Sequence, residues 1–395
     1  MMIKRNIALV LLLLNLFIAF LGIGLVIPVL PTIMNELELS GKMVGYLVSA
    51  FAFAQLLLSP IAGRWVDKYG RKPMIVLGLL LFSFSELLFG LGKNVEVLFI
   101  SRILGGISAA FIMPAVTAFI ADITTNDNRA KAMGYMSAAI STGFIVGPGI
   151  GGFLASVGTR VPFFAAAALG LVAAILSFVA LKEPKRHTQA LVKEKTKGFK
   201  KIFQPLFFIP FIIIFISTFG LAAFDSFFSL YVDHKFGFTP KDIAIIITGA
   251  GLVGAIAQII LFDFLTRKWG EIKLIRYSFI VSAVLVYLIT TVSTYFFILL
   301  ATIFVFIGFD LMRPAVTTYL TKVAGNQQGF VSGMNSMFTS VGNVIGPMIG
   351  GFLFDIDVDY PYFFAAIMLI IGMFITFPWK APTAEEYQEI QKETT

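Results

Sequence analysis

Long apolar runs separated by short polar segments dominate this sequence. A helix that crosses a bilayer needs about 20 predominantly apolar residues. Twelve runs meet or approach that length, at about residues 7–33, 43–62, 73–92, 97–120, 132–156, 161–181, 205–231, 242–263, 273–292, 295–320, 328–354 and 361–379. The first run is too long for the apolar core of a secretory signal, so we interpret it as a retained helix. The pattern predicts an all-α polytopic membrane protein with twelve transmembrane helices.

The composition excludes several classes of protein. The chain of 395 residues is 58% hydrophobic and contains 43 Phe, so a water-soluble fold would expose large apolar patches. The absence of cysteine rules out disulfides and thiolate metal sites. The two histidines, His187 and His234, fall in polar connections, and no phosphate-binding loop or nucleophile–base arrangement is evident. We therefore expect neither a cofactor nor a metal, and neither an enzyme nor a receptor.

The basic residues predict the orientation of the chain. If the amino terminus is cytoplasmic, the cytoplasmic segments hold 23 of the 30 Lys and Arg residues. Two more lie within helices, and the opposite loops hold only Lys42, Lys93, Arg160, Lys235 and Lys241. An excess of basic residues marks cytoplasmic loops. The sequence thus predicts a multi-pass protein of the cell membrane with both termini in the cytoplasm.

The chain divides into two similar halves. Three segments recur about 200 residues later: 52–58 as 255–261, 114–117 as 314–317, and 143–154 as 342–353. We expect an amino-terminal six-helix half (1–181), a basic cytoplasmic linker (182–204), a carboxy-terminal six-helix half (205–380) and a polar cytoplasmic tail (381–395). The basic linker suits a position beside anionic lipid headgroups and does not resemble a nucleic-acid site. Parallel six-helix repeats about an axis along the membrane normal are typical of major facilitator transporters.

A glycine-rich segment, 143–152, lies inside the fifth apolar run and is expected to be helical, since a spanning backbone must bond internally. Gly143, Gly147 and Gly151 recur every four residues and share one helix face, which lets another helix approach closely. Pro148 cannot donate to the carbonyl of Phe144, so we expect a kink or a swivel there. Tight helix packing alone would also account for this segment.

The loop 63–72 carries a more specific pattern. It combines Gly63, Asp67, Gly70 and Arg71 with Lys72. Gly70 permits a tight turn, Asp67 can accept hydrogen bonds from a helix end or a basic residue, and Arg71 and Lys72 are expected to face cytoplasm and lipid. This loop resembles the signature loop of the major facilitator superfamily. The corresponding loop 266–270 is degenerate, with Thr266 where we expect the equivalent of Asp67.

The resemblance extends over essentially the whole chain. Segments 21–29, 101–108 and 308–315 are similar to the Bmr/NorA-type multidrug efflux pumps of Gram-positive bacteria, and segment 143–152 resembles the glycine–proline signature of the drug:proton antiporter branch. The resemblance implies a monomeric exporter that exchanges protons for lipophilic, often cationic compounds such as dyes, quaternary ammonium compounds and fluoroquinolone-type drugs. A transporter dedicated to one endogenous metabolite or lipid is the alternative.

Ionisable residues inside membrane helices are functional candidates because they are costly to bury. Asp310 and Arg313 share a helix face and could be a purely structural pair, but Pro314 leaves the Asp310 carbonyl without its helical donor. Asp225 stands alone in an apolar run and is expected to hold a proton, because burial disfavours a charged carboxyl.

The family resemblance implies roles in proton coupling for Asp225, Asp310, Arg313 and Arg102. A static pairing of Arg102 with a carboxylate is equally open, and Glu86 is expected near water in a structural role. For the substrate pocket, the resemblance implies Phe20, Phe51, Gln55, Phe144, Phe306 and Asn335. Aromatic faces attract lipophilic cations, which gives this assignment a physical basis.

Overall fold

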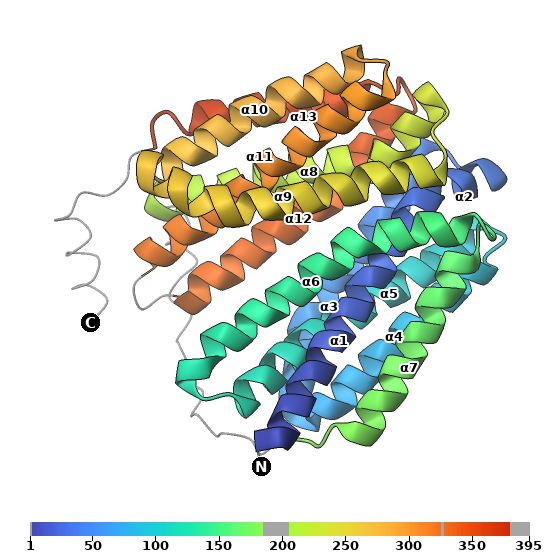
Figure 1. Ribbon diagram of the computed structural model, residues 1–395, viewed down its shortest axis with the longest axis vertical. Helices are drawn as coiled ribbons and strands as arrows, with labels where there is room; N and C mark the ends of the chain where they lie inside the picture. The colour runs from blue at the N-terminus through green and yellow to red at the C-terminus, as the bar shows by residue number, and fades with distance from the viewer. Residues whose placement is uncertain (1, 185–204, 325–327, 380–395) are drawn as a thin grey trace. The chain divides into compact units, whose positions relative to one another are not determined.

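The computed structural model describes residues 2–184, 205–324 and 328–379, and these residues are almost entirely helical (Figure 1). The first half contains α1 (Met2–Val26), η1 (Ile27–Val29), α2 (Leu30–Glu36), α3 (Gly41–Tyr69), α4 (Arg71–Leu91), α5 (Val95–Ile123), α6 (Asn126–Ala155) and α7 (Val161–Ala180). The second half contains α8 (Pro205–Phe236), α9 (Pro240–Trp269), α10 (Glu271–Thr291), α11 (Tyr295–Val323), α12 (Gln328–Phe354) and α13 (Tyr360–Ile375).

Eleven segments of the described chain are long and apolar enough to cross a membrane, and α13, with 16 residues, is a shorter apolar helix. The predicted membrane-protein class is confirmed, and every predicted run contains a helix. The first span, Ile7–Glu36, joins α1, η1 and α2. Pro28 and Pro31 lie at this junction. Because proline cannot donate a backbone hydrogen bond, a short 3₁₀ turn replaces regular helix there.

Several helices extend beyond their apolar runs, since polar side chains stabilise their ends. Ser40 precedes α3, and its hydroxyl accepts a hydrogen bond from the backbone N–H of Met43 at 3.3 Å. Asn94 precedes α5 and accepts from Val97 N–H at 3.1 Å. The first N–H groups of a helix lack partners within the helix, and these side chains supply them.

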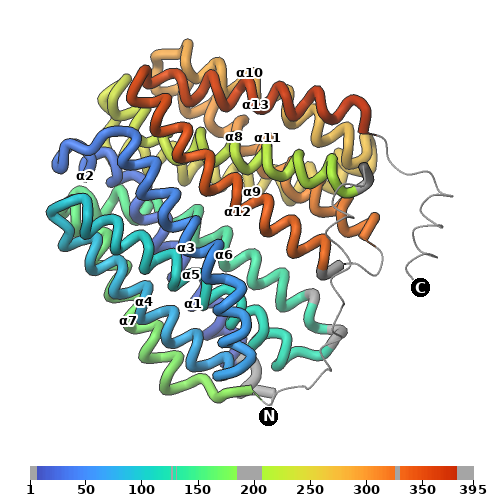
Figure 2. The backbone as a smooth tube through the Cα atoms, turned by 180° about the vertical axis from the view of Figure 1, so that it is seen from behind, coloured from blue at the N-terminus to red at the C-terminus, as the bar shows by residue number. Residues whose placement is uncertain are grey.

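Close helix pairs build each half. The chain divides into two compact units, Met1–Val192 with Val232–Thr248, and Lys193–Tyr231 with Gly249–Thr395. In the first unit α1 packs on α6, and α4 packs on α5 and α7; in the second, α10 packs on α11 and α13 (Figure 2). Serine side chains join α4 to α5: Ser85 donates to the carbonyl of Ser101 at 2.8 Å, and Ser101 donates back to that of Ser85 at 2.8 Å. Such interhelical hydrogen bonds stabilise membrane helices by about 0.6 kcal/mol each.

Candidate functional site

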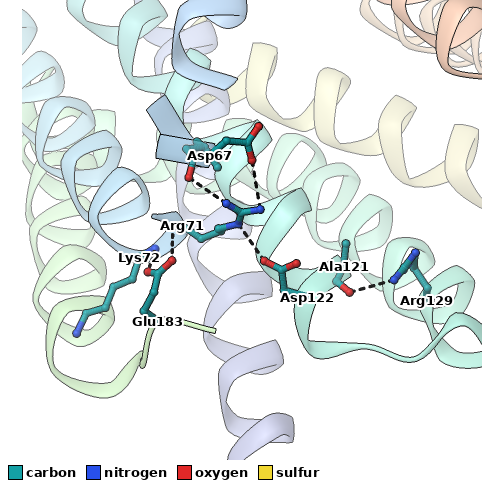
Figure 3. Close-up of polar contacts among 8 residues, drawn as sticks. Asp67, Arg71, Lys72, Ala121, Asp122, Arg129 and Glu183 are labelled. Atoms are coloured by element: carbon teal, nitrogen blue, oxygen red, sulfur yellow. Dashed lines mark hydrogen bonds and ion pairs between the residues drawn. The ribbon is translucent and has the colours of Figure 1, made fainter. Parts of the chain in front are cut away.

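The signature loop folds into an ion-pair cluster centred on Arg71 (Figure 3). Its guanidinium donates through Nε to Asp122 Oδ2 at 2.9 Å and through Nη1 to the carbonyl of Val66 at 3.1 Å. Nη2 lies 3.2 Å from Asp67 Oδ1. The planar guanidinium fork suits several acceptors at once. The Arg71 cluster thus joins the end of α3, the start of α4 and the end of α5.

This arrangement corrects one expectation about the loop. The Arg71 side chain is only 12% exposed and is enclosed by its acceptors. The prediction that it faces cytoplasm and lipid is therefore wrong. Asp67, with its side chain 61% exposed, accepts from a basic residue as predicted. The missed partner is Asp122, near the end of α5. The sequence did contain a signal for Asp122. In the internal repeat, Asp122 follows Pro114 at the same distance as Lys322 follows Pro314, so both halves have a charged residue at this position.

Glycines set the turn before each of the equivalent helices. Gly70 has φ +110° and Gly270 has φ +75°, a backbone region that favours glycine. Gly70 therefore turns the chain as expected, whereas a side chain at Gly63 would meet open space. Because Gly70 and Gly270 precede α4 and α10 in the same way, Arg267 and not Thr266 occupies the place equivalent to Asp67.

The glycine face of α6 packs directly on α1. A Cβ atom at Gly143 would lie 2.8 Å from the Phe17 carbonyl oxygen, and one at Gly147 would lie 2.7 Å from that of Leu21. A Cβ atom at Gly151 would come closer still to the carbonyl oxygen of Leu25. The predicted close approach is confirmed, and α6 remains a continuous helix through Pro148.

The second half repeats this packing between α12 and α8. A Cβ atom at Gly342 would lie 3.0 Å from the backbone nitrogen of Phe219, and one at Gly346 would lie 2.9 Å from its carbonyl oxygen. At Gly350 the neighbour is instead the ring of Phe227, at 2.9 Å. A helix pair whose contact depends on glycine therefore recurs in both halves.

Asp225 and Asp310 occupy different surroundings within the second half. Asp225 is half-buried on α8, and its carboxylate has no hydrogen-bond or ion-pair partner among the residues that the structure describes. Asp310 is half-buried on α11 and faces α9, where a side chain at Gly254 would overlap its Oδ2 atom. Gly254 therefore makes room for this carboxylate.

Arg313 influences Asp310 electrostatically but does not clamp it. Within the described residues no ion pair of 4.0 Å or less joins the two side chains, and Arg313 is exposed. A tight, mutually neutralising pair is therefore absent from this part of the chain. The Asp310 carboxylate remains available to another cation or to a proton.

Arg102 and Glu86 form a buried charged couple between α5 and α4. The guanidinium carbon of Arg102 lies 4.1 Å from the centre of the Phe89 ring, and Glu86 acts on it electrostatically. Glu86 is only 3% exposed, so the expectation that it reaches water is wrong. Arg102 Nη2 and Glu86 Oε2 are both buried without a hydrogen-bond partner in the described chain. Unsatisfied buried polar atoms are rare and mark a site where water, a proton or a different side-chain arrangement belongs.

The aromatic candidates fall into separate groups. Phe20 and Phe144 meet across α1 and α6 with ring centres 4.9 Å apart, and Phe306 lies 6.4 Å from Phe224 in an edge-on arrangement. Phe51 packs against the glycines of α5, with ring atoms 3.1 Å from the position of a Gly105 Cβ. Gln55 and Asn335 are both half-buried. The structure thus brings Phe20 and Phe144 together, and it places Phe51 against the glycines of α5.

Comparison with known proteins identifies the family. The sequence matches the Major Facilitator Superfamily over residues 12–235 and 210–394, so the chain belongs to this superfamily of multi-pass membrane transporters. It is 68% identical to Multidrug resistance protein 1 of Bacillus subtilis (strain 168) over 380 residues, covering 96% of this chain and 98% of that protein. It is 46% identical to Quinolone resistance protein NorA of Staphylococcus aureus (strain COL) over 362 residues, covering 91% and 93%.

Solved structures agree on the fold. A bacterial homologue of the human lysosomal transporter Spinster, in an inward-facing and occupied conformation, superposes with a TM-score of 0.81 at 17% identity, covering 95% of this chain and 96% of that one. A point mutant of the nucleoside transporter NupG gives 0.78 at 14% identity, covering 94% and 99%. The predicted major facilitator fold is therefore confirmed.

Proposed function

We propose that this protein is a proton-coupled multidrug efflux antiporter of the cell membrane. The observation that carries the proposal is the half-buried, unpartnered carboxylate of Asp225 on an apolar helix, among the residues that the structure describes. The similarity to proteins named for multidrug and quinolone resistance supports export of varied drugs. Drug export by such a protein needs a coupling group that can exchange a proton for a cationic substrate, and an isolated carboxylate has that property.

The coupling follows from competition for one negative charge. A proton or a bound lipophilic cation can neutralise a carboxylate in an apolar wall, but one carboxylate does not gain fully from both. On the outer side a proton displaces the drug, and on the inner side loss of that proton restores the charge. Asp225 and Asp310 are the proposed exchange groups, with Arg313 and Arg102 tuning the local field.

The remaining assignments belong to the same proposal. Phe20, Phe144 and Phe306, with Phe51, Gln55 and Asn335, would line the drug pocket, since aromatic faces attract organic cations. Two six-helix halves, 1–181 and 205–380, would move against each other around the glycine-packed helices. Both termini and the basic linker would lie in the cytoplasm, and the protein would act as a monomer.

A transport panel tests the proposed function. The protein should be expressed in cells that lack their own drug pumps, and efflux should be measured for several chemically unrelated lipophilic cations and for neutral metabolites. We expect several unrelated cations to be exported at comparable rates. A single good substrate among metabolites or lipids would instead support the dedicated transporter.

A further inference from the structure

The carboxylate of Glu183 occupies the amino-terminal end of α4 (Figure 3). Its Oε1 accepts a hydrogen bond from the backbone N–H of Arg71 at 2.7 Å, and its Oε2 accepts one from that of Lys72 at 2.8 Å. The first N–H groups of a helix have no partner within the helix, and a negative charge there is further favoured by the helix dipole. Since Glu183 follows the end of α7 at Ala180, this contact fastens α7 to the start of α4.

The turn before α4 is shaped around this carboxylate. A Cβ atom at Gly70 would lie 2.8 Å from Glu183 Oε1 and 2.9 Å from its Cδ atom, so a side chain at Gly70 would displace it. Lys72 adds a second contact between the two helices, with its ammonium 5.2 Å from the centre of the Phe178 ring on α7. Glycine at this turn therefore serves two purposes: it adopts the positive φ angle, and it leaves space for the Glu183 carboxylate.

Arg71 is the residue that connects this contact to the ion-pair cluster. Its backbone N–H is held by Glu183, while its guanidinium binds Asp67 and Asp122. A fixed backbone at Arg71 also fixes the direction of its Cα–Cβ bond, from which the side chain extends. This pre-organisation reduces the entropy lost when the flexible arginine side chain is ordered. A shift of Glu183 would consequently move the guanidinium relative to both of its carboxylate partners.

The second half fastens the corresponding helices with different chemistry. There Arg276 of α10 donates to Thr376 Oγ1 at 3.0 Å and to the carbonyl of Thr376 at 2.6 Å, just after α13 ends. At the start of α10, Glu271 pairs with Lys322 of α11. In sequence, Ala381 of segment 379–382 stands where segment 181–184 has Glu183. The acidic contact to the helix start is thus a property of the half that carries the complete signature loop.

The geometry points to Glu183 as a positioning residue for transport, which acts through Arg71 on the ion-pair cluster of the signature loop. It holds the backbone of Arg71 and Lys72 and belongs neither to the proposed drug pocket nor to the coupling carboxylates. For its effect on transport rate, this inference rests on the proposed efflux function. It also makes a prediction about the loop itself that does not depend on transport.

The transport test compares Glu183→Gln with Asp263→Asn. Glutamine offers one carbonyl oxygen, and its amide N–H groups then oppose the second backbone N–H. We expect the maximal rate of dye efflux to fall about fivefold, or about 1 kcal/mol, with an unchanged half-saturating dye concentration. Asp263→Asn should have no effect, because Asp263 and Arg267 form an ion pair whose side chains are 75% and 82% exposed. An unchanged rate in Glu183→Gln would overturn the inference.

A double-mutant cycle separates positioning from general stability. If Glu183 acts through Arg71, Glu183→Gln should add little to the defect of Asp122→Asn, because both changes release the same guanidinium. Glu183→Asp keeps the charge but is one methylene shorter, and it should restore part of the rate. Fully additive losses, with no recovery in Glu183→Asp, would indicate a structural role only and contradict the inference.

Thiol labelling tests the loop directly. The chain has no cysteine, so a single Lys68→Cys change on the exposed end of α3 reports the loop, and Lys268→Cys reports the equivalent position of α9. We expect Glu183→Gln to change the labelling rate about threefold or more at position 68 and to leave position 268 unchanged. Equal rates at position 68 would overturn the inference. A wild type that exports no drug would contradict the proposed function alone, since labelling still decides the role of Glu183.

Discussion

A carboxylate on an apolar helix can be neutralised by a proton or by a bound cation, and Asp225 and Asp310 differ in which of these their surroundings favour. Asp225 has no charged partner among the described residues, so burial acts on it unopposed. Asp310 feels the positive charge of Arg313 on the same helix. We therefore expect Asp225 to be the group that carries the proton and Asp310 to be the one that is charged more of the time.

The first prediction concerns these two carboxylates. Asp225→Asn and Asp310→Asn should both abolish uphill efflux, because neither amide can exchange a proton. Downhill dye movement should survive better in Asp225→Asn, which mimics the protonated form and leaves the negative charge of Asp310 near Arg313. Dye accumulation in inverted vesicles with an imposed pH gradient, at matched protein levels, measures both. If both variants still concentrate dye, these carboxylates are not the coupling site.

The second prediction concerns the Arg71 cluster. Arg71→Lys keeps the charge but loses the planar fork that reaches Asp67, Asp122 and Val66 together. We expect the maximal efflux rate to fall by about fivefold or more, with drug binding preserved, because the cluster shares no residue with the proposed drug pocket. Asp67→Asn should have a smaller effect of the same kind, since Asp67 is exposed. Binding measured by fluorescence and transport measured in vesicles separate the two effects, and normal transport in Arg71→Lys would refute a conformational role.

Single side chains also show where sequence reasoning ends. Asp225 and Asp310 could be singled out because charge within apolar helices is rare, and Arg71 because it belongs to the signature loop. The burial of Arg71 could not be predicted, because its partner Asp122 is 51 residues away and belongs to another helix. The expectation that Glu86 lies near water fails for the same reason, since the burial of its side chain depends on how α4 packs against α5.

At the scale of elements, the spacing of glycines allowed one close helix contact to be predicted. The repeat at positions 143, 147 and 151 identified the packing face, but the sequence did not show that the partner is α1. The ends of the helices were less well predicted. Polar residues at Ser40 and Asn94 extend α3 and α5 beyond their apolar runs through hydrogen bonds that hydropathy does not register.

The third prediction tests the α1–α6 contact with two changes on one helix. A methyl group at Gly147 would lie 2.8 Å from the Gly24 Cα atom, whereas one at Gly134 would meet nothing within 4 Å. We expect Gly147→Ala to destabilise the protein by about 1–2 kcal/mol despite the better helix propensity of alanine. Gly134→Ala should be neutral or slightly stabilising. Thermal unfolding in detergent compares them, and equal stability of the two variants would show that the contact is loose.

At the scale of the whole molecule, the internal repeat made the superfamily fold predictable, because three segments recur at offsets close to 200 residues. The repeat also shows what differs between halves. The first half carries the Arg71 cluster and the Glu183 contact, whereas the second half has Glu271 with Lys322 and an arginine held by Thr376. The two halves therefore share a helix framework but not the interactions at its ends.

The fourth prediction concerns topology. A cysteine at Lys93, an exposed residue, should react with an impermeant reagent added outside the cell, whereas cysteines at Lys182 and Thr394 should react only from the cytoplasm. Labelling of position 394 from outside would contradict an even number of spans with both termini in the cytoplasm.

The central claim is that a proton gradient drives export of lipophilic cations through this protein, and reconstitution tests it most directly. The purified protein should be placed in liposomes with an acidic interior, and a fluorescent lipophilic cation should be added outside without ATP. The account predicts that dye accumulates inside against its gradient, that protons leave the liposomes as it enters, and that an ionophore which collapses the pH difference stops both. Dye uptake that ignores the pH gradient, or that is unaccompanied by proton movement, would contradict it.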